Sequence, residues 1–322
     1  MTRVALFGVG STNFHYTVGT PEGDFVTAVS TEPTRPHALE TQLIDTLETR
    51  LESESLDAVA ISAPGLVDPE SGCISAFDTP DGALIEHLDL STPIERRFGL
   101  ETVVENDCSA SALGEWYFGQ RSDVRSLLHV TFGTGIGGGV VEDGRLVRGE
   151  HGQAGEFGLL PIEPEGPLES AAVTGAWEAY CSGRGIPQYV AHRLENGDGD
   201  GSVLSEIERE LTAQDVFDAA SDGDRFATDC LDRIARYNAA GIGTLCNSFN
   251  PGRVTVGGGV ALNNADWLLE GIDRYLERYC FVDRPELEIT PLGTEIGLYG
   301  ALGVYRKRLA GSVGQPTTEI TD

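Results

Sequence analysis

Lysine is nearly absent from this sequence, and basic residues of any kind are few. Lys307 is the only lysine, and Lys and Arg together number 22 against 51 Asp and Glu, for a formal net charge of -29. A field of that sign repels nucleic acid, so we expect no nucleic-acid partner. The acidity is typical of adaptation to a salty cytoplasm, where salt screens self-repulsion; a specific basic partner is the alternative.

Long apolar runs and clustered cysteines are also missing. No run reaches the ~18 residues of a membrane span, and the opening residues MTRVALF show no secretory pattern, so we expect a cytoplasmic chain without a membrane partner. Six cysteines are present, none in a C-x-x-C pair. Zinc clusters and disulfide frameworks need tighter spacing, so we interpret the cysteines as reduced and mostly packing residues. They are Cys73, Cys108, Cys181, Cys230, Cys246 and Cys280.

What the chain does contain is two halves with the same order of elements. With 322 residues, 40% of them hydrophobic, it is long enough for two globular domains. Each half opens on a predicted strand, a glycine-rich turn and a second strand, followed by helices alternating with buried strands. Strands are predicted within 4–7, 14–18, 56–65, 101–107, 127–132, 253–256 (ending in a glycine loop) and 287–290; helices are predicted at 37–53, 93–99, 108–119, 213–220, 224–249, 264–278 and 296–308.

Two glycine-rich turns are candidates for binding phosphate. The turn in VALFGVGSTN, residues 4–13, and the turn GTGIGGG, residues 133–139, could each cradle phosphate with backbone N–H groups. The second matches G-x-G-x-x-G, but VVEDGRLV follows it as strand, turn and strand. That context excludes a dinucleotide fingerprint, because such a motif must open a helix. A tight turn that needs φ > 0 is the alternative.

Polar residues that could carry chemistry follow a predicted strand. Asn106 and Asp107 end that strand, where ligands bind in α/β folds. Asp107 could accept the proton of a substrate hydroxyl and Asn106 could bond to another hydroxyl; the alternative is that Asp107 caps the next helix. His151, Glu156 and Glu178 could contact sugar hydroxyls, although surface glutamates of an acidic protein show the same pattern.

Together these segments resemble the ROK family of sugar kinases and repressors. The resemblance covers nearly the whole chain and is carried by SAPG at 62–65, VENDCSASALGEW at 104–116, FGTGIGGGVVEDGRLVRGEHGQAGEFG at 132–158, NPGRVTVGGGV at 250–260 and GLYGALG at 297–303. It implies an α/β, two-lobed actin-like ATPase (ribonuclease H-like) fold with a central cleft, ATP on one wall and sugar at the bottom. We expect a smaller lobe from 1–107 with 298–312, a larger lobe from 108–297, and a disordered tail at 313–322.

The resemblance also implies a role for each matching residue. Asp107 corresponds to the catalytic base that activates the sugar hydroxyl. The expected sugar-binding residues are Asn106, Glu156 and Glu178, together with Gly65 and His151. The expected ATP-binding residues are Gly10, Ser11, Thr12, Asn13, Gly133, Thr134, Gly135, Gly137, Gly257, Gly258 and Gly259.

The sequence departs from the family's pattern at three places. Gly8 stands where the family's first loop has an aspartate, which removes a carboxylate near Mg²⁺. Leu159 ends the family's GE-x-GH motif in place of histidine, which removes a zinc ligand and a sugar contact. The cysteine-rich zinc segment is replaced by EPEGPLESAAVTGAWE at 163–178, in which we expect Leu168 and Val173 to pack instead, so no structural zinc is expected. No helix-turn-helix precedes residue 4, so the repressor branch is not expected.

The sequence therefore predicts an acidic, haloarchaeal-type ROK kinase without the zinc motif. Its expected reaction is ATP- and Mg²⁺-dependent phosphorylation of a hexose, with glucose the first guess and Asp107 the general base. The alternative is a sugar- or nucleotide-binding protein that has lost transfer activity, which Gly8 and Leu159 favour. Asp107, Glu156 and Glu178 favour the enzyme. A homodimer or homotetramer is expected.

Overall fold

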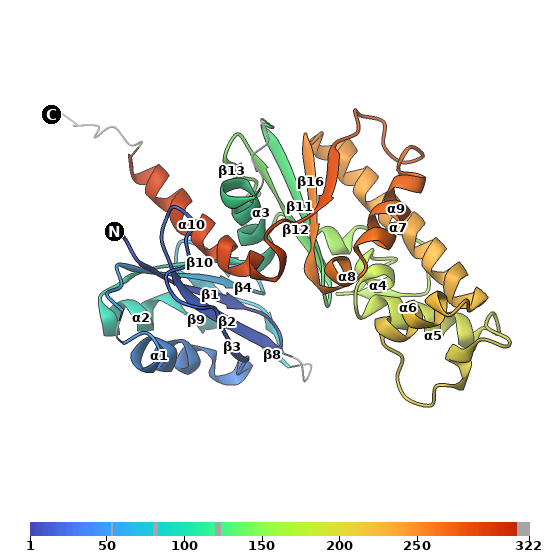
Figure 1. Cartoon of the computed structure of the whole chain (residues 1–322), viewed down its shortest axis with the longest axis horizontal. Helices are drawn as coiled ribbons and strands as arrows, with labels where there is room; N and C mark the ends of the chain where they lie inside the picture. The colour runs from blue at the N-terminus through green and yellow to red at the C-terminus, as the bar shows by residue number, and fades with distance from the viewer. Residues whose placement is uncertain (53, 80–82, 120–123, 314–322) are drawn as a thin grey trace. The chain divides into compact units, whose positions relative to one another are not determined.

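The computed structural model describes residues 1–52, 54–79, 83–119 and 124–313, and the chain divides into two compact units (Figure 1). Unit 1 comprises Met1–Arg121, Arg148–Ala154 and Thr294–Asp322, and unit 2 comprises Ser122–Val147 and Gly155–Gly293. The division differs from the expected boundary after residue 107, because the helix that begins at Asp107 packs inside unit 1. Of the expected tail 313–322, Val313 ends the last helix and the rest lies outside the described residues.

Unit 1 is built on a five-stranded mixed sheet with strand order β10-β4-β1-β2-β3. β1, β2 and β3 pair antiparallel, whereas β4 runs parallel to β1 and β10 runs parallel to β4. Every residue of β1 and β4 is buried, as expected for strands with both faces covered. The strands are β1 (Val4–Val9), β2 (Asn13–Gly19), β3 (Ser30–Pro33), β4 (Ala58–Ala63) and β10 (Glu101–Asn106).

Helices cover both faces of this sheet, with α1 (Leu39–Thr49) and α2 (Ser91–Phe98) below it in Figure 1 and α3 (Asp107–Phe118) and α10 (Ile296–Val313) above it. Phe7 lies in the apolar cluster on the α1 side, and Leu6 packs with Leu298 on the α10 side. α3 and α10 lie side by side. Glycine permits this approach, because a Cβ at Gly114 would lie 2.8 Å from the nitrogen of Gly300.

Short strands complete unit 1, and none of them was predicted. They pair antiparallel in two small sheets, where each strand contributes only two residues. One sheet contains β5 (Val67–Asp68), β6 (Cys73–Ile74) and β9 (Leu88–Asp89), and the other contains β7 (Phe77–Asp78) and β8 (Leu84–Ile85).

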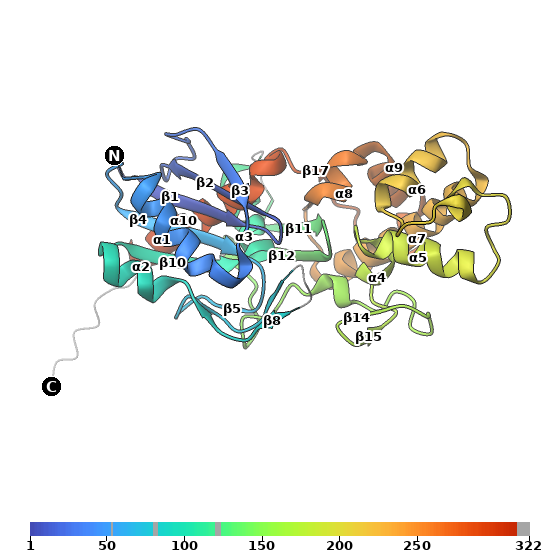
Figure 2. The same ribbon diagram turned by 90° about the horizontal axis from the view of Figure 1, so that it is seen from below.

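Unit 2 repeats the plan of unit 1, as the sequence predicts. Its sheet has the order β13-β12-β11-β16-β17, so the first strand again has an antiparallel hairpin on one side and two parallel strands on the other. The strands are β11 (Ser126–Phe132), β12 (Ile136–Glu142), β13 (Arg145–Leu146), β16 (Arg253–Gly257) and β17 (Glu286–Ile289). A separate hairpin of β14 (Glu169–Ser170) and β15 (Val173–Thr174) lies beside α4 (Figure 2).

The longest helix of unit 2 is α7, which packs on the sheet through one apolar face. It begins where Asp224 accepts a hydrogen bond from Ala227 N at 2.9 Å, and it ends at Asn250, whose φ of 44° is left-handed. Ile234, Ile242 and Leu245 are among its buried residues. The helices of unit 2 are α4 (Glu178–Cys181), α5 (Gly185–Glu195), α6 (Ala213–Ser221), α7 (Arg225–Phe249), α8 (Gly258–Asn263) and α9 (Ala265–Leu276).

Two local predictions differ from the structure, and some elements were missed. The glycine loop predicted after the strand at 253–256 is wrong, because Gly258 opens the short helix α8. The helix predicted at 37–53 is shorter, with the 3₁₀ turn Pro36–Ala38 before α1. α5 and the β14–β15 hairpin were not predicted. Further 3₁₀ turns are Phe157–Leu159, Val203–Glu206 and Gly293–Glu295. None of the described helices is long and apolar enough to cross a membrane.

Candidate functional site

Hydrogen bonds to its carbonyl groups fix the turn between β1 and β2. Gly10 N donates to Asn13 O at 2.8 Å, which closes the turn. Thr34 then bonds to two carbonyls of the turn, its Oγ1 donating to Gly10 O at 2.8 Å and its N–H to Thr12 O at 3.0 Å. Among the described residues, the N–H groups of Ser11 and Thr12 find no hydrogen-bond acceptor. The turn can therefore present two N–H groups to a phosphate.

The turn between β11 and β12 in unit 2 is built in the same way. Gly133 N donates to Gly135 O at 3.0 Å, and the connection from α4 to α5 holds the carbonyls. Gly183 N donates to Gly133 O at 2.8 Å and Arg184 N donates to Thr134 O at 3.3 Å. Nothing in the described part of the chain accepts from the N–H groups of Thr134 and Gly135. This turn has the same capacity for an anion. Gly137, in contrast, lies within β12, paired with Thr131.

The start of α8 lies directly against the second turn. Gly258 has a φ of 84°, and a Cβ there would lie 2.5 Å from Phe132 O and 2.9 Å from Gly133 N. Only glycine allows the two backbones to approach this closely. Gly259 has open space where its Cβ would be, and Gly257 packs over the ring of His129. Unit 2 thus brings together Gly133–Gly135 and Gly257–Gly259, as the resemblance implies.

Asp107 and Asn106 lie where β10 meets α3, and the cap of the helix is Asn106. Asn106 Oδ1 accepts from Cys108 N at 3.0 Å and from Ser109 N at 3.1 Å. Asp107 is the first helical residue, and its Oδ1 accepts from Cys108 N at 2.9 Å. The Cys108 thiol and the backbone N–H of Asp107 also hydrogen-bond to this carboxyl. Loss of hydration raises the pKa of the Asp107 carboxyl, although the Cys108 N–H opposes the shift.

Gly65 is held beside these residues by the other end of the Asn106 amide. Asn106 Nδ2 donates to Gly65 O at 3.1 Å. Gly65 has a φ of 100°, and a Cβ there would lie 2.0 Å from Ala76 O, so no other residue fits. Because β1, β4 and β10 run parallel, their carboxyl ends share one edge of the sheet. Unit 1 thus places the first turn, Gly65 and Asp107 along that edge.

Glu178 opens α4, and its carboxylate is tied to the second glycine turn. Oε2 accepts from Ile136 N at 3.0 Å, and Oε1 accepts from Ser170 Oγ of β14. Cβ atoms at Gly135 and Gly158 would lie 2.7 and 2.6 Å from Oε2, so glycines make the space that the carboxylate occupies. Glu178 is therefore a partly exposed candidate for sugar binding that also stabilises the second glycine turn.

His151 and Glu156 are both exposed, and they belong to different units. The segment with His151 is anchored to unit 1 by an ion pair between Arg148 and the buried Glu105 of β10. Ala154 N also donates to Arg148 O at 3.0 Å, which closes the segment on itself. Glu156 precedes the 3₁₀ turn Phe157–Leu159 of unit 2.

The segment that replaces the family's zinc motif packs with apolar side chains, as predicted. Leu159, Leu168 and Val173 all contact the main apolar cluster of unit 2. Ser170 and Val173 pair across a two-residue turn made by Ala171 and Ala172, whose φ values of 47° and 61° are left-handed. No group of three or more His, Cys, Asp or Glu that could hold a metal ion occurs in the described part of the chain.

Several contributing residues carry no signal that sequence reasoning could use. Thr34 acts from the position directly after β3, Ser170 acts from β14, and the segment Gly183–Arg184 acts through its backbone alone. A capping role for Asn106 was detectable, since Asn is favoured at an N-cap, but the neighbouring Asp107 gives the same signal.

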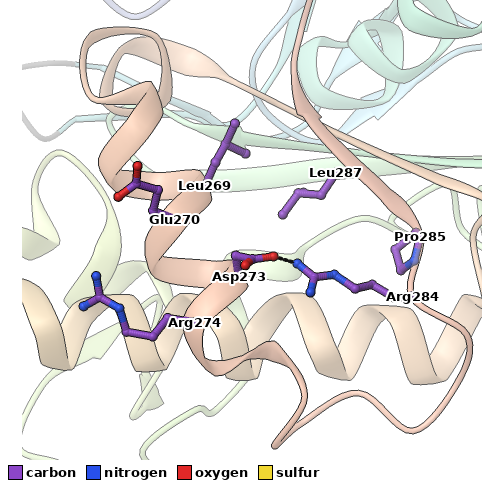
Figure 3. Close-up of a pocket in the computed structure, with 7 residues that line it drawn as sticks. All are labelled: Leu269, Glu270, Asp273, Arg274, Arg284, Pro285 and Leu287. Carbon is purple, nitrogen blue, oxygen red and sulfur yellow. Dashed lines mark ion pairs between the residues drawn. The ribbon is translucent and has the colours of Figure 1, made fainter.

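A cavity of about 580 Å³ on unit 2 lies apart from all of these residues (Figure 3). It is bordered by α9 and the segment leading into β17, and an ion pair between Asp273 and Arg284 crosses it. Its lining residues are Leu269, Glu270, Asp273, Arg274, Arg284, Pro285 and Leu287, none of which was predicted as a site residue.

Comparisons with known proteins agree with this arrangement. The ROK family's profile matches residues 6–307. A glucokinase from Halalkalibacterium halodurans is 32% identical over 270 residues, which is 81% of each chain.

Two solved structures are similar along almost their entire length. The ROK hexokinase from Thermus thermophilus has a TM-score of 0.79 and 30% identity, covering 97% of this chain and 100% of that one. The ROK family glucokinase from Streptomyces griseus in complex with glucose and AMPPNP has a TM-score of 0.75 and 29% identity, covering 93% and 98%. The chain belongs to the ROK family and has the two-lobed actin-like ATPase fold of its sugar kinases.

Proposed function

We propose that this ROK sugar kinase transfers the terminal phosphoryl group of ATP to a hexose, with glucose the first candidate and Asp107 as the general base. The observation that carries the proposal is that Asn106 and Asp107 have different roles at the start of α3. Asn106 caps the helix, so Asp107 is not needed as its N-cap and its carboxylate is available as a proton acceptor at the start of α3. A raised pKa makes that carboxylate a better proton acceptor.

In the proposed reaction, the Asp107 carboxylate takes the proton from the sugar hydroxyl as the hydroxyl oxygen bonds to the terminal phosphorus and ADP departs. The N–H groups of Ser11 and Thr12 in unit 1, and of Thr134 and Gly135 in unit 2, donate to phosphate oxygens. Asn13, Gly10, Gly137 and Gly257–Gly259 complete the nucleotide-binding set. Glu178, Glu156, Asn106, Gly65 and His151 form the sugar-binding set. Positioning and charge stabilisation account for most catalysis of this kind.

Mg²⁺ fits the residues that are present. The Asp107 carboxylate and the hydroxyls of Ser11 and Thr12 follow strands that end at the same edge of the unit 1 sheet. They are the hard oxygen ligands that Mg²⁺ prefers, and one or two carboxylates with substrate phosphates suffice. The ion would neutralise phosphate charge when it is bound with ATP. No structural zinc is part of the proposal.

Further parts of the proposal rest on composition and on the relatives. A net charge of -29 supports a halophilic protein of the cytoplasm, with small-molecule partners and neither nucleic acid nor membrane. The Streptomyces griseus structure, which holds glucose and AMPPNP, supports glucose and ATP as partners. A homodimer or homotetramer is proposed. The alternative function is a sugar- or nucleotide-binding protein without transfer, which the missing carboxylate at Gly8 favours.

The deciding experiment is an ADP-release assay across a panel of hexoses in molar KCl, with Asp107→Asn beside the wild type. Loss of a general base should lower turnover by ~10²–10⁴ while sugar affinity stays within several-fold. Asp45→Asn, an exposed carboxylate of α1, is the matched control and should be unchanged. Near-wild-type turnover in Asp107→Asn would disprove the base. No transfer to any hexose in the wild type would support the binding protein.

A second readout separates catalysis from folding. A carboxyl whose folded-state pKa is raised favours folding while it is protonated, and that contribution is lost as pH rises through the folded pKa. The charge of Asp107 therefore opposes folding at neutral pH. Asp107→Asn should lose turnover and still melt at or above the wild-type temperature, which a merely unfolded variant would not do.

A further inference from the structure

Two of the six cysteines interact although one lies in α7 and the other lies in the segment after α9. Cys246 lies in the last turn of α7, and Cys280 lies just beyond the end of α9. The thiol of Cys246 is hydrogen-bonded to the side chain of Cys280. Cys246 is fully buried, whereas Cys280 is partly exposed and donates to Val282 O at 3.5 Å. Both are free thiols in the structure.

The neighbouring residue Asn247 fixes this contact on both sides. Its Nδ2 donates to Tyr279 O at 2.7 Å, and its Oδ1 accepts from Phe281 N at 2.7 Å. The residues before and after Cys280 are thus bonded to the residue after Cys246. The register of the 279–281 segment on α7 is therefore set by two hydrogen bonds and not by thiol contact alone.

A glycine one turn earlier in α7 brings the segment close. A Cβ at Gly243 would lie 2.7 Å from Tyr279 Cβ and 2.9 Å from its carbonyl carbon. Positions 243, 246 and 247 share one face of the helix, because residues three and four apart are neighbours on its surface. Figure 1 shows α7 and α9 side by side, so the two cysteines join elements that already pack together.

We propose that Cys246 and Cys280 form a reversible disulfide when the protein meets a low-molecular-weight disulfide. The Cys280 thiolate attacks one sulfur of the oxidant and releases the first small thiolate, leaving a mixed disulfide on Cys280. The Cys246 sulfur then attacks Cys280 Sγ and releases the second. Two protein thiols lose two electrons and two protons, and the oxidant becomes two thiols.

The environment of each sulfur agrees with this order. Cys280 is the sulfur that a reagent in solution can reach. Burial and the neighbouring sulfur raise the pKa of the Cys246 thiol, so it reacts poorly with outside reagents. The sulfur with which Cys246 reacts is therefore that of the neighbouring Cys280. The segment 279–281 includes the highly exposed Phe281, so the reagent meets no apolar cover there.

The cross-link would close a loop that contains β16, α8 and α9, and with them Gly257–Gly259. Closing a loop of about 35 residues restricts the unfolded chain, and the two side chains that would be linked already interact. The oxidised protein should therefore melt at a higher temperature than the reduced one.

The experiment treats the intact protein with hydroxyethyl disulfide, removes the reagent, and counts free thiols in denaturant. Two thiols should be lost, the mass should fall by two hydrogens, and an unreduced digest should contain a peptide pair linking Cys246 and Cys280. The thermal midpoint should rise by at least about 4 °C and return on reduction. Cys280→Ser should lose both effects, and Cys73→Ser, a partly exposed cysteine of β6, should keep both.

Three results would overturn the proposal. They are an unchanged thiol count under excess oxidant, a linked peptide pair that does not include both cysteines, and a covalent dimer on a non-reducing gel. If Cys280→Ser does not fold, Cys246→Ala serves in its place and carries the same expectation. A shift in melting that persists in either variant would also contradict the cross-link.

Discussion

The Glu178 carboxylate accepts a hydrogen bond at 3.0 Å from the backbone N–H of Ile136, the residue that follows the second glycine turn. Its other oxygen accepts from Ser170 Oγ. Glu178→Gln keeps the shape but can no longer accept at both ends. We expect the KM for sugar to rise roughly tenfold, since a hydrogen bond to a charged group contributes ~1.5 kcal/mol or more, with a smaller change in kcat. Glu169→Gln, exposed on β14, is the control, and equal KM values for the two variants would contradict the role.

The sequence predicts several features of the fold and the candidate site, but it does not predict the contacts of Glu178. The strands β1 and β4 and the helix α7 were predictable, because continuous or periodic apolar residues determine them locally. The edge that holds Gly65 and Asp107 follows from parallel strands. The tie between Glu178 and Ile136 was not predictable, because it depends on glycines at 135 and 158 that leave room for a carboxylate.

The start of α8 was also not predictable from the sequence. Gly257–Gly259 were predicted as a loop, since glycine disfavours helices. The helix begins there because Gly258 must pack against Phe132 O, and the packing outweighs local propensity. A hairpin turn of two alanines, Ala171 and Ala172, likewise carries no turn signal in the sequence.

His129 should make the stability of unit 2 sensitive to acid. It is fully buried between Thr255 and Thr131, and burial lowers its pKa from 6.5 to about 3. Between those pH values the unfolded chain binds a proton that the folded chain does not. The free energy of unfolding should therefore fall as pH drops from about 6.5 towards 3, by up to ~1.4 kcal/mol per pH unit from this residue.

Denaturant titrations at several pH values and constant KCl measure this slope. His129→Gln removes the titrating group and should flatten the pH dependence even if it lowers stability overall. A slope in His129→Gln equal to that of the wild type would show that other groups govern the acid transition.

Substitutions in the turn of the β14–β15 hairpin should make the protein more stable. Ala171 and Ala172 both hold left-handed backbone, at φ 47° and 61°, where a Cβ is unfavourable. Two-residue hairpin turns of this kind favour Asn-Gly. Replacing the pair by Ala171→Asn and Ala172→Gly should raise the free energy of unfolding by about 1 kcal/mol. Ala220→Gly in helix α6 should have the opposite sign, so a loss of stability in both proteins would contradict the argument.

Folding should depend strongly on salt. With a net charge of -29, like charges repel over a screening length that grows from ~3 Å at 1 M to ~10 Å at 0.1 M salt. Thermal midpoints measured from roughly 0.1 to 3 M KCl should rise steeply, because added salt screens the repulsion between like charges. A flat profile would leave the acidity without this explanation.

The last prediction concerns Gly8, which pairs with His15 on β2 and Ser62 on β4. A Cβ at Gly8 would lie 3.5 Å from the carbonyl carbon of Gly297 and 3.6 Å from Leu298 N, which is ordinary contact. A side chain therefore fits at this position and starts towards the beginning of α10. Glycine itself offers Mg²⁺ no oxygen from a side chain there, so Asp107 is the remaining carboxylate of the proposed site.

Gly8→Asp should lower the Mg²⁺ concentration needed for half-maximal rate, measured at saturating ATP and sugar. Gly8→Asn has the same shape without the charge, so it should titrate like the wild type and exclude a purely steric effect. If Gly8→Asp and Gly8→Asn titrate alike, the added carboxylate does not reach the metal. In that case the N–H groups at the start of α10 are the competing partner, because a carboxylate is stabilised at a helix N-terminus. A higher thermal midpoint in Gly8→Asp than in Gly8→Asn would identify that outcome.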